Sequence, residues 1–124
     1  MESDVVESDV VESQQSGSRH CQVVTTVGSA EDARQLAESS VLARLAACAQ
    51  VSGPLTSTYW WEGEVNRADE WQVVFKTTMG RYDDLQAYLL DSHPYDMPEI
   101  LCLPVTAGNP AYLAWVSDET ADTG

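Results

Sequence analysis

The order of strand-like and helix-like segments after residue 20 is the feature that most constrains how this chain can fold. Segments rich in β-branched and aromatic residues predict strands at 21–27, 48–61, 71–79 and 100–105. Segments with apolar residues at helical spacing predict helices at about 29–46, 80–91 and 111–118. The predicted order is therefore β-α-β-β-α-β followed by a C-terminal helix.

Local signals set several of these boundaries. Ser29 is a favourable N-cap for the first helix, and Asn109 followed by proline is a start signal for the last one. Gly53-Pro54 is expected to break or bend the second strand, and residues 62–69 read as a polar connection to the third strand. Pro104 lacks an amide donor, which places the fourth strand at a sheet edge.

The predicted element order is that of an α+β sandwich with the split βαβ, ferredoxin-like arrangement. Both long helices are expected on one face of an antiparallel sheet. Large aromatic residues would then remain on strands that two helices cannot cover, namely Tyr59, Trp60, Trp61, Trp71 and Phe75. Such an uncovered aromatic surface usually marks an association surface, so we expect an obligate oligomer.

The N-terminal residues 1–18 differ in kind from the rest of the chain. The pentapeptide ESDVV occurs twice and a third copy begins, so that acidic residues accumulate with no basic residue among them. Low complexity with charge of one sign predicts a disordered tail. We expect the folded domain to span residues 19–120 and the C-terminal residues 121–124 to be disordered as well.

Composition excludes several classes of function. The chain has 124 residues, 44% of them hydrophobic, which is enough for one domain with a core. Twenty acidic residues against six basic ones give a net charge of −14, which disfavours a nucleic-acid partner. There is no apolar run long enough to span a membrane and no secretory leader, so a cytoplasmic location is expected. Three widely spaced cysteines predict reduced thiols.

Five sequence blocks in register resemble the divalent-cation tolerance family CutA. These blocks are LAACA at 45–49, STYWWEG at 57–63, KTT at 76–78, HPY with PEI at 93–100, and LPV with GNP at 103–110. The resemblance covers about residues 21–120. It implies a small cytosolic homotrimer with a ferredoxin-like subunit, similar to PII signalling trimers and linked to tolerance of copper and other divalent cations.

The resemblance implies no catalytic activity, and the sequence shows no catalytic motif, so we expect a protein that is not an enzyme. Two alternatives to a role in metal tolerance stay open. One is a PII-like sensor that binds a small molecule between subunits. The other is a protein-anchoring module, because animal relatives have been associated with anchoring acetylcholinesterase.

His93 is the candidate metal ligand, because copper prefers imidazole and thiolate donors to carboxylates alone. In some bacterial relatives a cysteine and a second histidine are proposed to bind copper together with the equivalent of His93. The resemblance places Thr25 and Ser92 at those two positions, so only one of the three donors remains. The ion expected is Cu(II) or another divalent cation, with Asp96 or Glu99 as oxygen donors. Alternatively, His93 ends the second helix or hydrogen-bonds at a subunit boundary.

A second candidate site is a ligand cleft between subunits. Lys76, the only lysine, either lies along the surface or lines this cleft. Comparison with PII-like trimers adds four further residues to the cleft, which are Trp61, Glu62, Tyr95 and Glu99. Cys48 is expected to be a small core residue, whereas Cys21 and Cys102 are expected as thiols on neighbouring strands.

Overall fold

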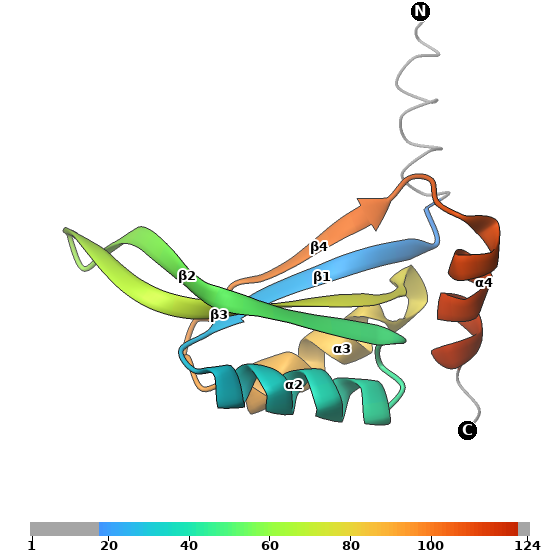
Figure 1. The fold of residues 1–124 in the computed structure, drawn as a ribbon, viewed down its shortest axis with the longest axis horizontal. Helices are drawn as coiled ribbons and strands as arrows, with labels where there is room; N and C mark the ends of the chain where they lie inside the picture. The colour runs from blue at the N-terminus through green and yellow to red at the C-terminus, as the bar shows by residue number, and fades with distance from the viewer. Residues whose placement is uncertain (1–17, 122–124) are drawn as a thin grey trace, which may run out of the picture.

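The computed structural model describes residues 18–121 and contains the predicted order of elements (Figure 1). The predicted disorder of the acidic repeat and of the last residues concerns segments outside this range, apart from Ser18 and Ala121. The elements are β1 (His20–Val27), α2 (Ala30–Leu42), β2 (Cys48–Trp61), β3 (Glu64–Thr78), α3 (Met79–Ser92), β4 (Ile100–Val105) and α4 (Pro110–Glu119).

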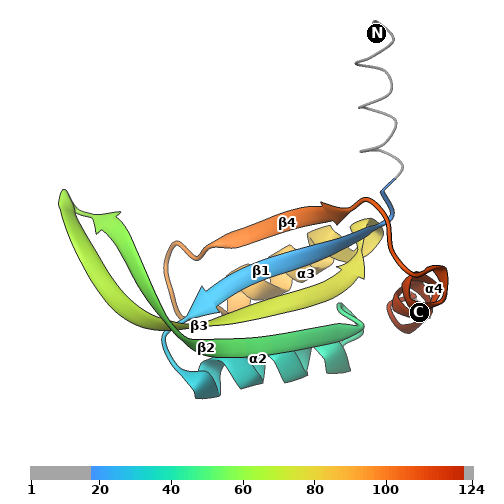
Figure 2. The ribbon, with the colours of Figure 1, turned by 45° about the horizontal axis from the view of Figure 1, so that its top comes forward.

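The four strands form one antiparallel sheet in the order β2-β3-β1-β4. Helices α2 and α3 lie on the same face of this sheet, and α4 lies beside one end of it (Figure 2). The core between sheet and helices contains fully buried side chains, among them Val23, Val73, Phe75, Leu85 and Leu89. This arrangement is the predicted ferredoxin-like sandwich with an additional C-terminal helix, and β4 lies at the edge as Pro104 indicated.

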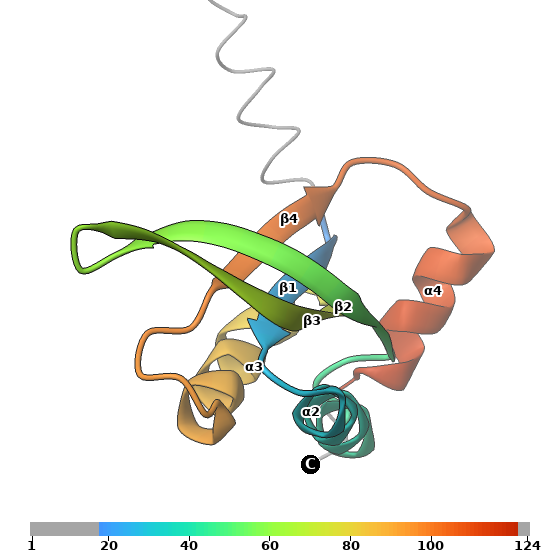
Figure 3. The ribbon, with the colours of Figure 1, turned by 60° about the vertical axis from the view of Figure 1, so that its left-hand side comes forward.

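The polar connection predicted for residues 62–69 is wrong. β2 and β3 continue as a paired ribbon up to Trp61 and Glu64, so that only Glu62 and Gly63 form the turn. Both turn residues have positive φ, 51° and 81°, as tight hairpin turns between twisted strands require. Polar residues are tolerated in this ribbon because it projects beyond the helices and is exposed on both faces (Figure 3).

Gly53 lies where the ribbon bends away from the body of the sheet. The pairing register of β2 with β3 shifts between Ser52 and Leu55, which confirms the predicted irregularity. Gly53 has φ 153°, and a Cβ atom there would lie 2.5 Å from Trp71 Cδ1. Only glycine therefore fits between the bend and the Trp71 indole.

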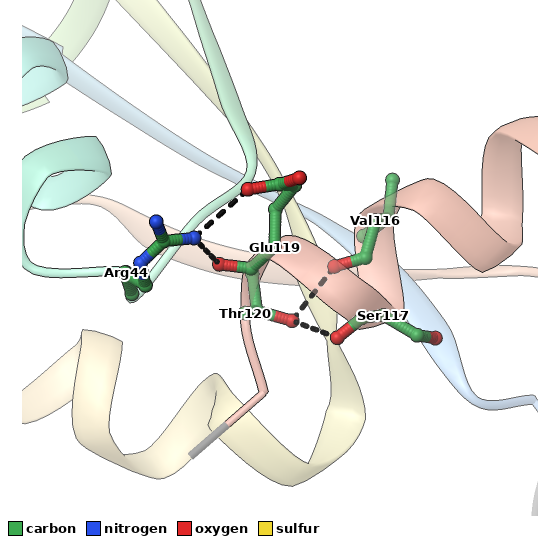
Figure 4. A network of polar contacts seen from close by, with 5 residues as sticks. All are labelled: Arg44, Val116, Ser117, Glu119 and Thr120. Carbon is green, nitrogen blue, oxygen red and sulfur yellow. Dashed lines mark hydrogen bonds and ion pairs between the residues drawn. The ribbon is translucent and has the colours of Figure 1, made fainter. Parts of the chain in front are cut away.

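Side-chain caps and one ion pair fix the helix ends. The Ser29 side chain accepts from the Asp32 amide at 3.1 Å, and Asn109 Oδ1 accepts from the Ala111 amide at 2.9 Å, which confirms both predicted caps. Arg44 Nη1 donates to the Glu119 backbone oxygen at 3.0 Å and to Glu119 Oε1 at 2.8 Å (Figure 4). These contacts attach the end of α4 to the loop after α2. No helix within residues 18–121 has the length and apolarity of a membrane-spanning segment.

Candidate functional site

His93 is buried where α3 meets the sheet. It caps the C-terminus of α3, its backbone amide donates to the Leu89 carbonyl at 2.8 Å, and Pro94 prevents the helix from continuing. Its side chain is only 8% exposed. The ring is therefore held in place by the helix end on one side and by β1 on the other.

Both ring nitrogens of His93 have hydrogen-bond partners. Nε2 lies 2.9 Å from the Thr26 backbone oxygen and 3.0 Å from Thr25 Oγ1, while Nδ1 lies 3.1 Å from the Tyr95 backbone nitrogen. A carbonyl oxygen can only accept and an amide can only donate. These partners therefore select the neutral ring with its proton on Nε2.

The environment of His93 favours this neutral state. Burial lowers the pKa of His93 below its usual value, against a smaller opposing effect of the Thr26 backbone bond and of the Asp32 and Glu70 charges. Protonation would also direct an Nδ1–H group at the Tyr95 amide, which is itself a donor. His93 therefore acts as a neutral connector between β1 and the segment that follows α3.

Tyr95 extends this network to β3. Its hydroxyl donates to Glu70 Oε2 at 2.9 Å, and its ring centroid lies 5.0 Å from that of His93. Burial and the hydrogen bond to Glu70 raise the pKa of Tyr95 to about 12. At Gly28 a Cβ atom would lie 3.3 Å from the Tyr95 hydroxyl, so the end of β1 also approaches this group.

A single chain does not bring the predicted cleft residues together. Lys76 is near the C-terminal end of β3, where its Nζ donates to Gln50 Oε1 at 3.0 Å. Trp61 and Glu62 are at the tip of the β2–β3 ribbon. Residues 64 to 76 of β3 cover roughly 40 Å at about 3.3 Å per residue, so the tip and Lys76 are far apart within one subunit. Of the five predicted cleft residues, only Tyr95 contacts His93.

The donors around His93 do not fit a divalent metal centre within one chain. Within residues 18–121, His, Cys, Asp and Glu side chains nowhere gather in threes as a metal ion requires. Thr25 does lie beside His93, as its place in the resemblance suggested, but its hydroxyl is hydrogen-bonded to the ring. A metal ion on either ring nitrogen would displace a partner of that nitrogen. Asp96 and Glu99 are exposed on the segment after α3.

Nothing in the sequence marks Thr26 or Glu70 as partners in the His93 network, and Tyr95 is predicted only as a cleft residue and not as a partner of the ring. Thr26 and Tyr95 act on the ring through backbone atoms, which any residue type supplies. Glu70 is one of many carboxylates in the sequence, and only the fold places it against the Tyr95 hydroxyl.

Cys48 is half-buried at the start of β2 rather than enclosed in the core as predicted, and it lies beside the hydroxyl of Tyr112 on α4.

A hollow on the described surface does not include His93 among its lining residues. It measures about 430 Å³ and lies between α2 and α3, with Leu36, Leu42 and Tyr88 among its lining residues. Ser92 and Pro94 reach its rim, whereas the His93 ring points toward the sheet. This hollow therefore does not contain the hydrogen-bond network described above.

The sheet face opposite the helices carries exposed apolar side chains. Leu101 and Leu103 on β4 are exposed, and by the pairing register Tyr59 and Trp61 of the ribbon lie on the same face. Trp60 pairs with Val65 on the other side of the ribbon. Trp60 is 73% exposed. Within the described residues α4 reaches only the end of the face opposite the helices, at His20 and Cys48, and no other element of the same chain covers it (Figure 3).

Comparison with known proteins gives consistent matches over the folded part. A family described as CutA1 divalent ion tolerance protein matches residues 21–119. The divalent-cation tolerance protein CutA of Thermus thermophilus is 42% identical over 98 residues, which cover 79% of this chain and 95% of that protein. The chloroplastic protein CutA 1 of rice is 36% identical over 101 residues, covering 82% of this chain. The aligned part is 57% of the rice protein, so this chain spans little more than half of that relative's length.

Solved structures agree with the sequence comparison. CutA from Synechococcus elongatus superposes with a TM-score of 0.81 at 38% identity, covering 84% of this chain and 92% of that one. CutA1 from Oryza sativa superposes with a TM-score of 0.82 at 34% identity, covering 85% of this chain and 96% of that one. The similarity therefore extends over nearly the whole described fold.

Proposed function

The chain belongs to the CutA1 divalent ion tolerance family, and from this membership we propose that it is a non-enzymatic homotrimer that contributes to tolerance of divalent cations, copper among them. The proposed trimer is supported by two features, the apolar sheet face that the helices do not cover and the ribbon that projects beyond the sheet. Exposed apolar surface of this kind is stabilised when another subunit covers it.

The ribbon favours a closed ring of subunits. It leaves the body of its own chain, so its aromatic tip is available to contact a neighbouring copy. Contacts between different surfaces of identical subunits form rings when the rotation closes. In such a ring Trp61 and Glu62 of one subunit would meet residues that another subunit contributes, which would assemble the cleft that one chain alone leaves apart.

In this proposal His93 is a positioning residue rather than a metal ligand. Its neutral ring connects the Thr26 carbonyl with the Tyr95 amide and so fixes the start of the 93–99 segment. That segment presents the exposed carboxylates of Asp96 and Glu99. Ion contacts would then come from carboxylates brought together between subunits.

Sedimentation velocity at micromolar concentration tests the assembly. We expect three times the 13.6 kDa chain mass. Trp60→Glu on the ribbon should weaken the assembly, because it places a charge in the proposed interface. Leu42→Glu is the matched control, since Leu42 is equally exposed, at 78%, but lies on α2. A well-folded wild-type monomer, or equal disruption by both variants, would contradict the proposal.

Growth under copper stress tests the cellular role. Cells lacking the gene should grow less well than the parent strain in copper-supplemented medium, and the restored chain should recover growth. The Trp60→Glu variant should recover less if the assembled form is the active one. Equal growth of parent and deletion strains over a series of divalent cations would count against a role in tolerance.

A further inference from the structure

Three sulfur atoms gather at one end of the sheet, away from His93. Cys21 lies on β1, Cys102 on β4, and Met79 is the first residue of α3. Cys21 pairs with Pro104 and Cys102 pairs with Val23, so the two cysteines are diagonal neighbours on the helix-covered face. The Met79 amide donates to the Arg19 carbonyl at 2.8 Å, which holds the start of α3 beside the start of β1.

Contacts between these sulfur atoms are direct. The Cys102 thiol donates to Met79 Sδ at 3.9 Å. The Cys21 thiol is close enough to that of Cys102 for Cys102 to raise its pKa. Both cysteines are free thiols. Cys21 is 1% exposed, Cys102 is half-buried and Met79 is 41% exposed, so the group opens to the surface on the methionine side.

The spacing matches that of ligands around one metal ion. Two sulfur ligands at about 2.3 Å from a metal in a trigonal plane lie roughly 4.0 Å apart. The observed 3.9 Å between Cys102 Sγ and Met79 Sδ is close to this separation. A metal ion bound by both Cys102 and Met79 would therefore require little change in the separation of these two sulfur atoms.

We propose that Cys21, Cys102 and Met79 form a binding site for monovalent copper. Thiolate and thioether sulfur are soft donors, which favour Cu(I) over the harder divalent ions. No oxidant or reductant takes part: Cu(I) forms bonds to three sulfur atoms, and the two thiol protons pass to solvent. The site lies apart from the carboxylates of the proposed divalent-cation role and does not depend on it.

Proton release makes the affinity depend on pH. Burial, and then the hydrogen bond with Cys102, raises the pKa of the Cys21 thiol to about 12. Copper must compete with protons for this sulfur atom. Affinity should therefore rise with pH, as it does for metal sites whose ligands lose protons on binding.

Competition with a colorimetric Cu(I) chelator such as bathocuproine disulfonate, on reduced protein without oxygen, tests the site. We expect one Cu(I) per chain. Cys102→Ser should lower the affinity by more than about tenfold, since loss of even an outer partner of a ligand costs roughly 10–100-fold. Cys48→Ser is the matched control. Cys48 pairs with Lys76, and Lys76 pairs with Gln22, so these three side chains share one face of the sheet. Cys21 is next to Gln22 in β1 and therefore lies on the opposite face. Unchanged binding by Cys102→Ser, or equal losses in both variants, would overturn the proposal.

X-ray absorption at the copper edge gives a second test that does not depend on a cysteine variant. In selenomethionine-labelled protein, Met79 should add a copper–selenium distance to the copper–sulfur shell. Met97→Leu should keep this distance and Met79→Leu should abolish it. Copper ligands that include no selenium, or that are nitrogen and oxygen atoms, would overturn the proposed site. Sedimentation of the same variants separates this outcome from failure of the trimer, because Cys102 lies on the helix-covered face and Met79 on α3, away from the sheet face of the proposed interface.

Discussion

Replacing His93 with leucine would remove the ring that connects two backbone groups. The Thr26 carbonyl and the Tyr95 amide would lose their partners, at 2.9 and 3.1 Å. A buried polar group left unpaired costs about 1–3 kcal/mol. The Tyr95 amide is only partly buried, so we expect the free energy of unfolding to fall by about 2–4 kcal/mol. Leucine still fills most of the space, which limits any contribution from a cavity.

Urea denaturation followed by tryptophan fluorescence would measure this loss at a fixed protein concentration, because the proposed assembly would make stability depend on concentration. Thr25→Val is the control. It removes the hydroxyl 3.0 Å from Nε2 but leaves the ring bonded to the Thr26 carbonyl, so it should cost about 1 kcal/mol. If His93→Leu proved no less stable than Thr25→Val, the connector role derived from the ring geometry would be refuted.

Three further predictions concern pH, the bend and the core. Because burial lowers the pKa of His93, the unfolded chain takes up a proton that the folded chain does not as the pH falls through about 6.5. Urea titrations should show that the free energy of unfolding decreases from pH 7.5 to 5.5, and that this decrease is smaller in His93→Leu than in the wild-type chain. An equal decrease in the two proteins would contradict this prediction. Gly53→Ala should lower the free energy of unfolding by about 1–3 kcal/mol through backbone strain, and further through the clash of the new Cβ atom with Trp71. Gly80→Ala, inside α3, should not lower the free energy of unfolding. Leu85→Ala should lower the free energy of unfolding by about 2–5 kcal/mol, and a loss below 1 kcal/mol would contradict its place in the core.

Local chemistry made much of the fold predictable. Ser29 and Asn109 mark helix starts because their side chains replace missing helical partners, and Pro104 marks an edge because it cannot donate. The β2 half of the ribbon agrees with the predicted strand at 48–61, but residues 64–70 of β3 are not predictable as strand, for the opposite reason. Residues such as Asn66 and Asp69 have weak strand propensity, and pairing with β2 places them in a strand nonetheless.

The candidate sites were less predictable, because they depend on register. His93 was identified as a residue of interest, but its partners are largely backbone atoms that leave no trace in the sequence. Cys21 and Cys102 were assigned to neighbouring strands, but their contact requires the diagonal relation that the β1–β4 register creates. The spacing of residues along the chain does not contain that information.

The ribbon also has a consequence for the order of folding. β1 pairs with β3 only from residue 71 onward, so residues 64–70 pair with β2 alone. A two-stranded ribbon without a third strand or a helix beneath it is marginally stable in water. Its amide hydrogens should therefore exchange with solvent sooner than those of Val73 or Phe75, and proteases should cleave there first when the protein is dilute. The third strand and the helices support the body of the sheet within one chain, whereas in the proposed assembly a second molecule would support the outer half of the ribbon.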